Sequence, residues 1–304
     1  MNRRTLLATL LAASTCMAAR AAPPFALQAD GAPYTLTNTK VHTLHSAALG
    51  RDYQVFVSLP AGYAADGPAL PLVLVTDADY AFPLVRAITA RVSGHSTAIA
   101  PYLLVGVSYA AGDTAEYSRR RDYTPSINPE PGLLADMPGR KPAWGQADAY
   151  RRFLADEVLP LLAARYRANL KHSVFVGHSY GALLGTHILF SQPELFSQYV
   201  LSSPSLWYDQ RLMFQREQAY AASHRDLKAD VFFAVGGYEA VRPGPRYNRD
   251  TDMVRDLRAF DAALRAHRYP GLRTQLQVFE GHDHLTVFPD MITTALKWAL
   301  PGQR

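Results

Sequence analysis

The sequence predicts an α/β fold in which a mostly parallel central sheet carries helices on both faces. Segments typical of strands alternate with segments typical of helices between residues 40 and 299, and this alternation favours parallel pairing. Two strand segments, 71–75 and 102–108, are predominantly apolar, as expected of strands buried on both faces. A third apolar run leads directly into Gly-His-Ser-Tyr-Gly at 177–181, a pattern typical of a sharp turn between a strand and a helix.

The first part of the chain supplies four of the predicted strands and one helix. Residues 40–46 and 52–59 are predicted to form two early strands that pair antiparallel. Between the buried strands 71–75 and 102–108, residues 80–92 have the apolar spacing of a helix. The sheet is therefore expected to begin with an antiparallel pair and to continue with parallel strands.

The second part begins with a long polar connection, residues 109–143, that is rich in Arg, Pro and Gly. A connection of that length inside a compact domain is usually functional. Residues 147–167 then form an amphipathic helix that leads into the strand before the Gly-His-Ser-Tyr-Gly motif. The remaining predicted elements are a helix from residue 180, strands at 199–202, 231–235 and 274–279, and helices at 212–224, 251–268 and 290–299.

Residues 1–21 have the pattern of a secretory signal peptide. Arg3 and Arg4 precede an apolar run, and small residues follow it, with cleavage predicted after Ala21. The apolar run is too short to span a bilayer permanently, so no stable membrane insertion is expected. The paired arginines leave both the general and the twin-arginine export routes open. The protein is predicted to be periplasmic or secreted, with residues 22–304 as one domain.

The composition excludes several classes of protein. Cys16 is the only cysteine and lies in the predicted leader, so the mature chain has no disulfide, thiolate metal site or cysteine nucleophile. Three leader arginines contribute to the net charge of +5, and their removal leaves 28 basic against 26 acidic residues, or +2. This small charge gives no argument for nucleic-acid binding. The histidines lack metal-ligand spacing, and no metal or cofactor is predicted. The sequence leaves the oligomeric state open.

The motif at 177–181 places a serine where a nucleophile is expected. Its glycines let the backbone turn so sharply that the Ser179 side chain stands exposed above the sheet. The helix from Tyr180 directs its N–H groups and positive dipole end to the same place, where an oxyanion would form. The backbone N–H groups of Tyr180 and Asp79 are the predicted oxyanion donors. The side chains of Asp77 and Asp79 are alternatively helix caps.

A serine hydroxyl needs a histidine that accepts its proton and a carboxylate that orients this histidine. In chains with such a strand-to-helix turn the order is Ser, acid, His. Two histidines, His282 and His284, follow the last predicted strand. His284 is the preferred base because it lies deeper in the turn, and His282 is kept as the alternative.

The acid is expected in the loop after the strand at 231–235. Glu239 lies where this loop opens and is the preferred carboxylate. Its rivals are Asp250, Asp252 and Asp256. They lie near the start of the next predicted helix, where a carboxylate is more often a cap or a partner of the helix dipole.

Several segments also carry a family resemblance. They are Asp77-Ala78-Asp79, Arg121-Asp122-Tyr123-Thr124-Pro125, Ser203-Pro204-Ser205-Leu206-Trp207, Gly236-Gly237-Tyr238-Glu239, and His284 with Val287 and Pro289. Together they resemble the putative-esterase branch of the α/β-hydrolase superfamily, closest to its siderophore (enterobactin and salmochelin) esterase-like hydrolases. The resemblance implies an α/β-hydrolase fold over residues 22–304 and a serine esterase with the triad Ser179, Glu239 and His284. Alanine at position 78 departs from the family's glycine.

Two groups of side chains are predicted to bind substrate. Arg119, Arg120 and Arg121 form an expected anion-recognising rim, because arginine offers paired donors to carboxylate or catecholate oxygens. Trp207 and Tyr208 are expected to stack a flat aryl or acyl group. The predicted function is hydrolysis of a small-molecule ester, a siderophore ester or another aryl or acyl ester, through an acyl-enzyme. Acyl transfer to an alcohol or sugar, and a catalytically silent ligand-binding module, are the alternatives.

Overall fold

The computed structural model describes residue 31 and residues 33–95, 98–128 and 136–302. The chain divides into two compact units, Met1–Thr35 and Leu36–Arg304. The predicted leader and its cleavage site at Ala21 lie outside the described residues, so export to the periplasm or beyond stays a prediction. The fold below is that of the second unit. Within the described residues, no helix combines the length and the apolarity needed to cross a membrane.

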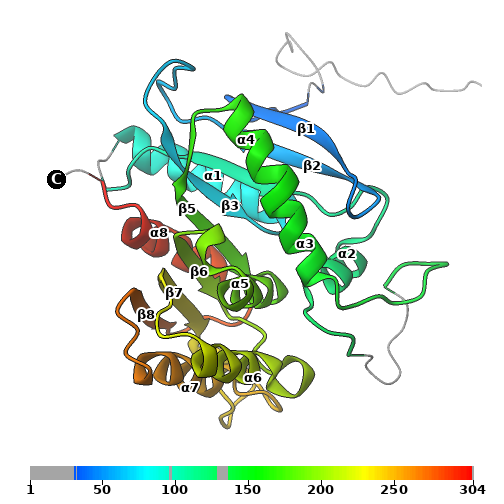
Figure 1. Ribbon diagram of the computed structural model, residues 1–304, viewed down its shortest axis with the longest axis vertical. Coiled ribbons are helices and arrows are strands. Elements are labelled where there is room, and N and C mark those ends of the chain that lie inside the picture. Colours follow the sequence, from blue (N-terminus) through cyan, green and yellow to red (C-terminus); the bar gives the residue numbers. More distant parts are fainter. Residues whose placement is uncertain (1–30, 32, 96–97, 129–135, 303–304) are drawn as a thin grey trace, which may run out of the picture. The chain divides into compact units, whose positions relative to one another are not determined.

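Eight strands of the described chain form one sheet in the order β1-β2-β4-β3-β5-β6-β7-β8 (Figure 1). The strands are β1 (Thr39–Ser46), β2 (Arg51–Ser58), β3 (Leu70–Val75), β4 (Leu103–Val107), β5 (Ala168–His178), β6 (Gln198–Ser202), β7 (Ala229–Gly236) and β8 (Leu272–Phe279). Strand β2 pairs antiparallel with β1 and β4, and β3 to β8 pair parallel. The predicted mostly parallel sheet, with an antiparallel pair at its start, is confirmed.

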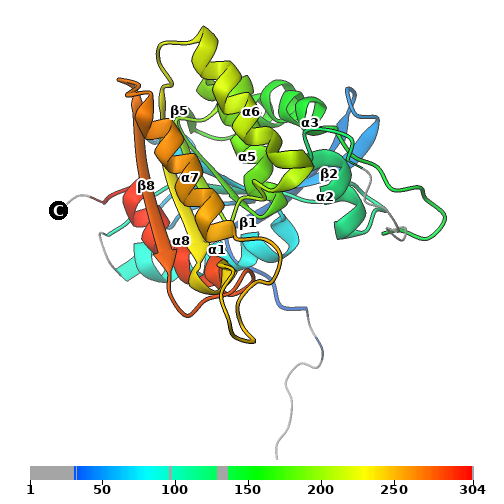
Figure 2. The same ribbon diagram turned by 90° about the horizontal axis from the view of Figure 1, so that it is seen from below.

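Helices cover both faces of this sheet. They are α1 (Ala78–His95), α2 (Ala115–Tyr123), α3 (Ala147–Phe153), α4 (Leu159–Arg165), α5 (Tyr180–Ser191), α6 (Tyr208–Ser223), α7 (Met253–Ala266) and α8 (Val287–Ala299). Helices α1 and α8 lie on one face, and α3, α5, α6 and α7 lie on the other (Figure 2).

Each face has its own hydrophobic cluster because side chains alternate along a strand. In β7, Val231 and Phe233 belong to the cluster under α5 and α7, whereas Phe232 and Ala234 belong to the cluster under α1 and α8. All four are fully buried. This two-sided burial explains why the parallel strands read as continuous apolar runs.

Two predicted boundaries change. The long connection at 109–143 contains α2, whose first turn is capped by Thr114 through a bond from the Tyr117 amide of 3.3 Å. The helix predicted at 147–167 is α3 and α4, joined by a π-helical turn at Leu154–Val158.

The parallel strands bring the predicted functional loops to one edge of the sheet. Ser179 follows β5, Glu239 follows β7 and His284 follows β8. Since β5, β6, β7 and β8 are neighbours that run in the same direction, their carboxyl ends meet at the edge where ligands bind in such sheets.

Candidate active site

The turn from β5 into α5 holds Ser179 in an unusual backbone conformation. Its φ of 57° and ψ of −118° fall where non-glycine residues are rarely found. Both motif glycines are required by space, because a Cβ on Gly177 would lie less than 3.0 Å from the Gly181 carbonyl, and one on Gly181 less than 3.0 Å from Oγ1 of Thr76. The serine therefore stands on a tight turn that is pressed against the end of β3.

Glu239 and His284 form a direct pair. The Nδ1 of His284 lies 2.6 Å from Oε2 of Glu239. The carboxylate is fully buried, and its Oε1 accepts bonds from the Ser203 hydroxyl at 2.6 Å and from the Gly236 amide at 2.8 Å. A buried charge needs such partners, and here they fix the carboxylate so that one oxygen faces the imidazole.

The rival acids are engaged elsewhere. Asp252 caps α7 by accepting the Arg255 amide at 2.8 Å, and Asp256 lies 2.5 Å from the guanidinium of Arg211. Asp250 is exposed. Of the four candidates, Glu239 is the one that meets a histidine of the last loop.

His282, the rival base, turns toward the start of α8. Its Nδ1 lies 3.2 Å from the Thr286 carbonyl and its Nε2 lies 3.5 Å from a carboxylate oxygen of Asp290. The geometry therefore favours His284 as the base of the site.

His178 connects the serine turn to this base. Its ring centre lies 4.6 Å from that of His284 and 5.7 Å from that of Phe288. Its Nδ1 is 3.1 Å from the Ser202 hydroxyl. Because His178 immediately precedes Ser179, the contact sets the serine turn beside the imidazole of His284. The sequence predicts that a histidine inside this motif packs or hydrogen-bonds locally, and the bond to Ser202 and the contact with Phe288 agree with this prediction; its contact with His284 is tertiary and has no pattern in the sequence.

The loop after β3 is anchored to the same turn by an arginine. Asp77, with a φ of 55°, is buried and accepts Arg119 Nε at 2.6 Å and the Tyr109 hydroxyl at 2.8 Å. Arg119 also reaches the His178 carbonyl at 3.4 Å. The side chain of Asp77 therefore anchors α2 to the loop, and it does not cap α1.

Both predicted oxyanion donors lie in first helical turns. Tyr180 is the first residue of α5, and Asp79 is the second residue of α1. The close approach of Gly181 to Thr76 brings these two helix starts together. Backbone N–H groups in a first turn point out of the helix along its positive dipole end, an arrangement suited to an anion.

The expected arginine rim is corrected by the structure. Arg120 pairs with Asp136 and lies over the Trp144 ring. Arg121 is 3% exposed and is surrounded by carboxylates: its Nη1 lies 2.7 Å from Asp113, and its Nε lies 2.8 Å from Asp122. Neither guanidinium is available to bind a substrate anion, because carboxylates of the protein already bind both of them.

Of the three arginines, Arg119 is the one that touches the serine turn. It lies 25% exposed in its ion pair with Asp77, with its guanidinium 5.8 Å from the centre of the Tyr180 ring. Its contacts indicate that it positions the loop and the turn.

The predicted aromatic pair divides into one exposed and one buried residue. Trp207 is 36% exposed, and its ring centre lies 6.3 Å from that of Tyr180. Tyr208 is buried, and its hydroxyl donates to the Ser126 carbonyl at 2.8 Å. Trp207 therefore remains a candidate surface for a flat group, whereas Tyr208 packs inside the fold.

Two buried histidines of this region make the stability depend on pH. Burial, together with His284 and Arg119, lowers the pKa of His178 to about 3. Burial beside Arg216 lowers the pKa of His187 to about 3. Below pH ~6.5 the unfolded chain binds these protons and the folded protein does not, so the free energy of unfolding falls as the pH falls.

Each of these histidines is expected to lower the free energy of unfolding by about 2 kcal/mol between pH ~6.5 and pH ~5. Urea unfolding at the two pH values measures the loss, and a His187→Gln variant isolates one contribution. The loss in this variant is expected to be smaller by about 2 kcal/mol. Equal losses in both proteins would contradict the low pKa of His187.

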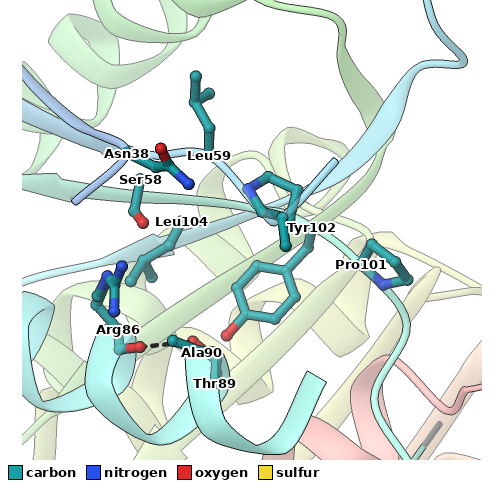
Figure 3. A pocket seen from close by; sticks show the side chains of 11 residues that line it. Asn38, Ser58, Leu59, Arg86, Thr89, Ala90, Pro101, Tyr102 and Leu104 are labelled. Carbon is teal, nitrogen blue, oxygen red and sulfur yellow. Dashed lines mark hydrogen bonds between the residues drawn. The ribbon is translucent and has the colours of Figure 1, made fainter. Parts of the chain in front are cut away.

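A separate cavity of about 140 Å³ lies away from these residues. Figure 3 shows it between α1, the end of β2 and the start of β4, with Arg86, Tyr102 and Leu104 around it. These strand ends belong to the edge opposite Ser179, so the cavity is no part of the candidate site. In the part of the chain that the structure describes, no group of three or more His, Cys, Asp or Glu side chains is arranged to hold a metal ion.

Comparison with known protein families gives a match over most of the chain. The model of a family described as "Putative esterase" matches residues 46–297. The ferri-bacillibactin esterase BesA of Bacillus subtilis is 26% identical over 280 residues, which cover 88% of this chain and 91% of that protein. The siderophore triacetylfusarinine C esterase of Aspergillus fumigatus is 25% identical over 283 residues, which cover 87% and 94%.

Solved structures agree on the fold. The BES protein from Bacillus cereus superposes with a TM-score of 0.76 at 23% identity, covering 90% of this chain and 99% of that one. The siderophore hydrolase EstB from Aspergillus nidulans gives a TM-score of 0.69 at 22% identity, with 90% and 98% covered. At these identities the likeness is one of fold, and the chain has an α/β-hydrolase fold.

Proposed function

Because this chain belongs to the putative esterase family and is a carboxylic ester hydrolase, we propose that Ser179, His284 and Glu239 act as its catalytic triad. The observation that carries the proposal is the bond of 2.6 Å between His284 and the buried carboxylate of Glu239. A carboxylate held in this way keeps the proton on Nδ1 and leaves Nε2 as the base. The strained turn that presents Ser179 beside the same imidazole supports its role as nucleophile.

The proposed reaction has two halves with balanced proton transfers. Ser179 Oγ attacks the ester carbonyl carbon while its proton moves to Nε2 of His284. The carbonyl re-forms, the bond to the alcohol oxygen breaks, and His284 returns the proton to the leaving alcohol. Water then attacks the acyl-enzyme and gives one proton to His284, which passes it to Ser179 Oγ as the acid departs.

In this proposal, the starts of α5 and α1 stabilise the oxyanion that develops on the substrate carbonyl oxygen. The backbone N–H groups of Tyr180 and Asp79 are the proposed donors. Support comes from the contact of Gly181 with Thr76 and from the ion pair between Arg119 and Asp77. Together they hold the loop after β3 against the serine turn. A donor set that needs no rearrangement stabilises the transition state most effectively.

Siderophore esters are the proposed substrates, with other aryl or acyl esters as the wider class. The printed names of the relatives include esterases of ferri-bacillibactin and of triacetylfusarinine C. The partly exposed side chain of Trp207, beside the Tyr180 ring, is suited to an aromatic acyl group.

Covalent labelling tests the proposed nucleophile. Diisopropyl fluorophosphate is expected to add once to the protein, at Ser179, and to abolish hydrolysis of p-nitrophenyl butyrate in proportion to the labelling. Peptide mass spectrometry locates the adduct, and Ser203, which bonds the acid, is expected to remain unlabelled. Loss of activity with the adduct on another residue would contradict the assignment of Ser179 as the nucleophile.

A further inference from the structure

A second set of arginines lies in the loop that follows the candidate acid and differs from the corrected rim. We name residues 241–249, which follow Glu239, the arginine loop. It holds Arg242, Arg246 and Arg249 and no acidic residue. All three side chains are exposed, and the described residues place no carboxylate in an ion pair with any of them. Their charge is therefore available to a ligand, whereas that of Arg120 and Arg121 is not.

Two of these arginines are held in place by tyrosines. The Arg242 guanidinium lies 5.8 Å from the centre of the Tyr247 ring, and the Arg246 guanidinium lies 5.6 Å from that of Tyr238. The two tyrosine rings meet edge to face at 5.3 Å. Stacking of a guanidinium on a ring restricts its motion and leaves its N–H edges open, so less entropy is lost when an anion binds.

Hydrogen bonds tie the arginine loop to the acid and to the base loop. The side-chain NH₂ group of Asn248 donates to the Glu239 carbonyl at 3.1 Å, and the backbone N–H of Asn248 donates to the Tyr238 carbonyl at 3.0 Å. The Tyr238 amide in turn donates to the His282 carbonyl at 3.0 Å. The loop leaves the carboxyl end of β7 ahead of α7 (Figure 2), at the same edge of the sheet as Ser179.

We propose that Arg242, Arg246 and Arg249 form an anion-binding subsite that selects esters carrying negative charge while the scissile carbonyl lies at Ser179. This inference rests on the proposed function, because it extends that same site. Exposed guanidinium groups bind carboxylate or catecholate oxygens through paired N–H donors. Several such contacts on one substrate add to its binding without taking part in bond breaking, so they act on KM and not on kcat.

The experiment is a comparison of binding and turnover in variants matched for charge. Arg242→Gln, Arg246→Gln and Arg249→Gln are combined in one variant. The control combines Arg225→Gln, Arg258→Gln and Arg268→Gln, which removes the same charge from exposed positions outside the loop. Substrates are the ferric complex of a tricatecholate trilactone, which is an anion, and neutral p-nitrophenyl butyrate.

The loop variant is expected to raise KM for the ferric complex about 10- to 100-fold with kcat nearly unchanged. Its KM for the butyrate ester, and both KM values of the control, should stay within about twofold. Added salt is expected to raise the wild-type KM for the ferric complex and to have less effect on the loop variant. An unchanged KM for the ferric complex, or an equal rise for both substrates, overturns the proposal.

The same pair of variants in a Ser179→Ala background separates this proposal from the catalytic one. Quenching of tryptophan fluorescence by the ferric complex then reports Kd without turnover. A Kd raised about 10- to 100-fold by the loop substitutions alone supports the subsite even if the wild-type protein cleaves neither ester. An unchanged Kd, in a protein that hydrolyses both esters through Ser179, overturns the subsite and leaves the triad intact.

Discussion

Replacing Ser179 with alanine is expected to lower kcat for ester hydrolysis by about 10⁶-fold, since removal of a nucleophile from a triad abolishes the acyl-enzyme route. The fold should be retained, because alanine at position 179 has to adopt the same backbone conformation as serine, with a φ of 57°, and its side chain is smaller. Steady-state hydrolysis of p-nitrophenyl butyrate measures the loss, and urea unfolding checks stability. Ser191→Ala, which removes a hydroxyl on an exposed residue that donates to the His187 carbonyl, should keep activity within about twofold.

The same variant pair identifies the substrate class. A kcat/KM for a tricatecholate trilactone that exceeds that for the butyrate ester by several decades, and that disappears in Ser179→Ala, supports a siderophore esterase. Cleavage of the butyrate ester alone would keep the mechanism and exclude the siderophore substrate. Residual activity in Ser179→Ala above about 1% of the wild-type kcat would contradict the nucleophile, because the effect of losing it is far larger.

The sequence was sufficient for those elements whose pattern is local. Strands β3 and β4 were predicted to within about two residues because burial on both faces makes them continuous apolar runs. The turn at Ser179 was recognisable because two glycines at fixed spacing are needed for the backbone to approach itself and Thr76. Glu239 and His284 were predicted from the order of the loops along the chain. In the structure, Nδ1 of His284 lies 2.6 Å from Oε2 of Glu239.

Features that depend on contacts between residues far apart in the sequence could not be predicted. Helix α2 has few apolar residues, so its periodicity is hidden, and its buried side is charged. Arg121 meets Asp113 and Asp122, and the carboxylate of Asp122 also accepts the hydroxyl of Tyr53 from β2. An arginine run looks like a solvated or ligand-binding surface until such partners are known. The signal for the arginine loop was present as three arginines without an acid between Glu239 and Asp250, but its stacking on tyrosines is tertiary.

Some backbone features are equally invisible in sequence. Asp209, Gln210 and Arg211, at the start of α6, all have positive φ values, of 44°, 51° and 64°, although none is glycine. L-residues avoid this left-handed conformation, so no local propensity predicts it. The turn is supported from outside, because the Ser126 hydroxyl lies 2.5 Å from Asp209 and Arg211 lies 2.5 Å from Asp256.

The choice of acid is tested by Glu239→Gln, for which we expect kcat to fall by about 10⁴-fold with KM little changed. Glutamine keeps the shape of the side chain, and its oxygen can still accept the Ser203 hydroxyl and the Gly236 amide. Its NH₂ group then faces Nδ1 of His284. That geometry favours the tautomer with the proton on Nε2, which cannot accept the proton of Ser179.

Asp252→Asn is the matched control for this charge removal. Asparagine also caps helices well, so the bond to the Arg255 amide and the stability should be largely retained, with kcat within about twofold of wild type. The reverse result, a collapse of kcat in Asp252→Asn and near-normal turnover in Glu239→Gln, would assign the acid to α7. Because His284 meets Glu239 at 2.6 Å, whereas Asp252 accepts its own helix amide, the imidazole has one carboxylate to orient it, and the loss of that orientation should appear in kcat.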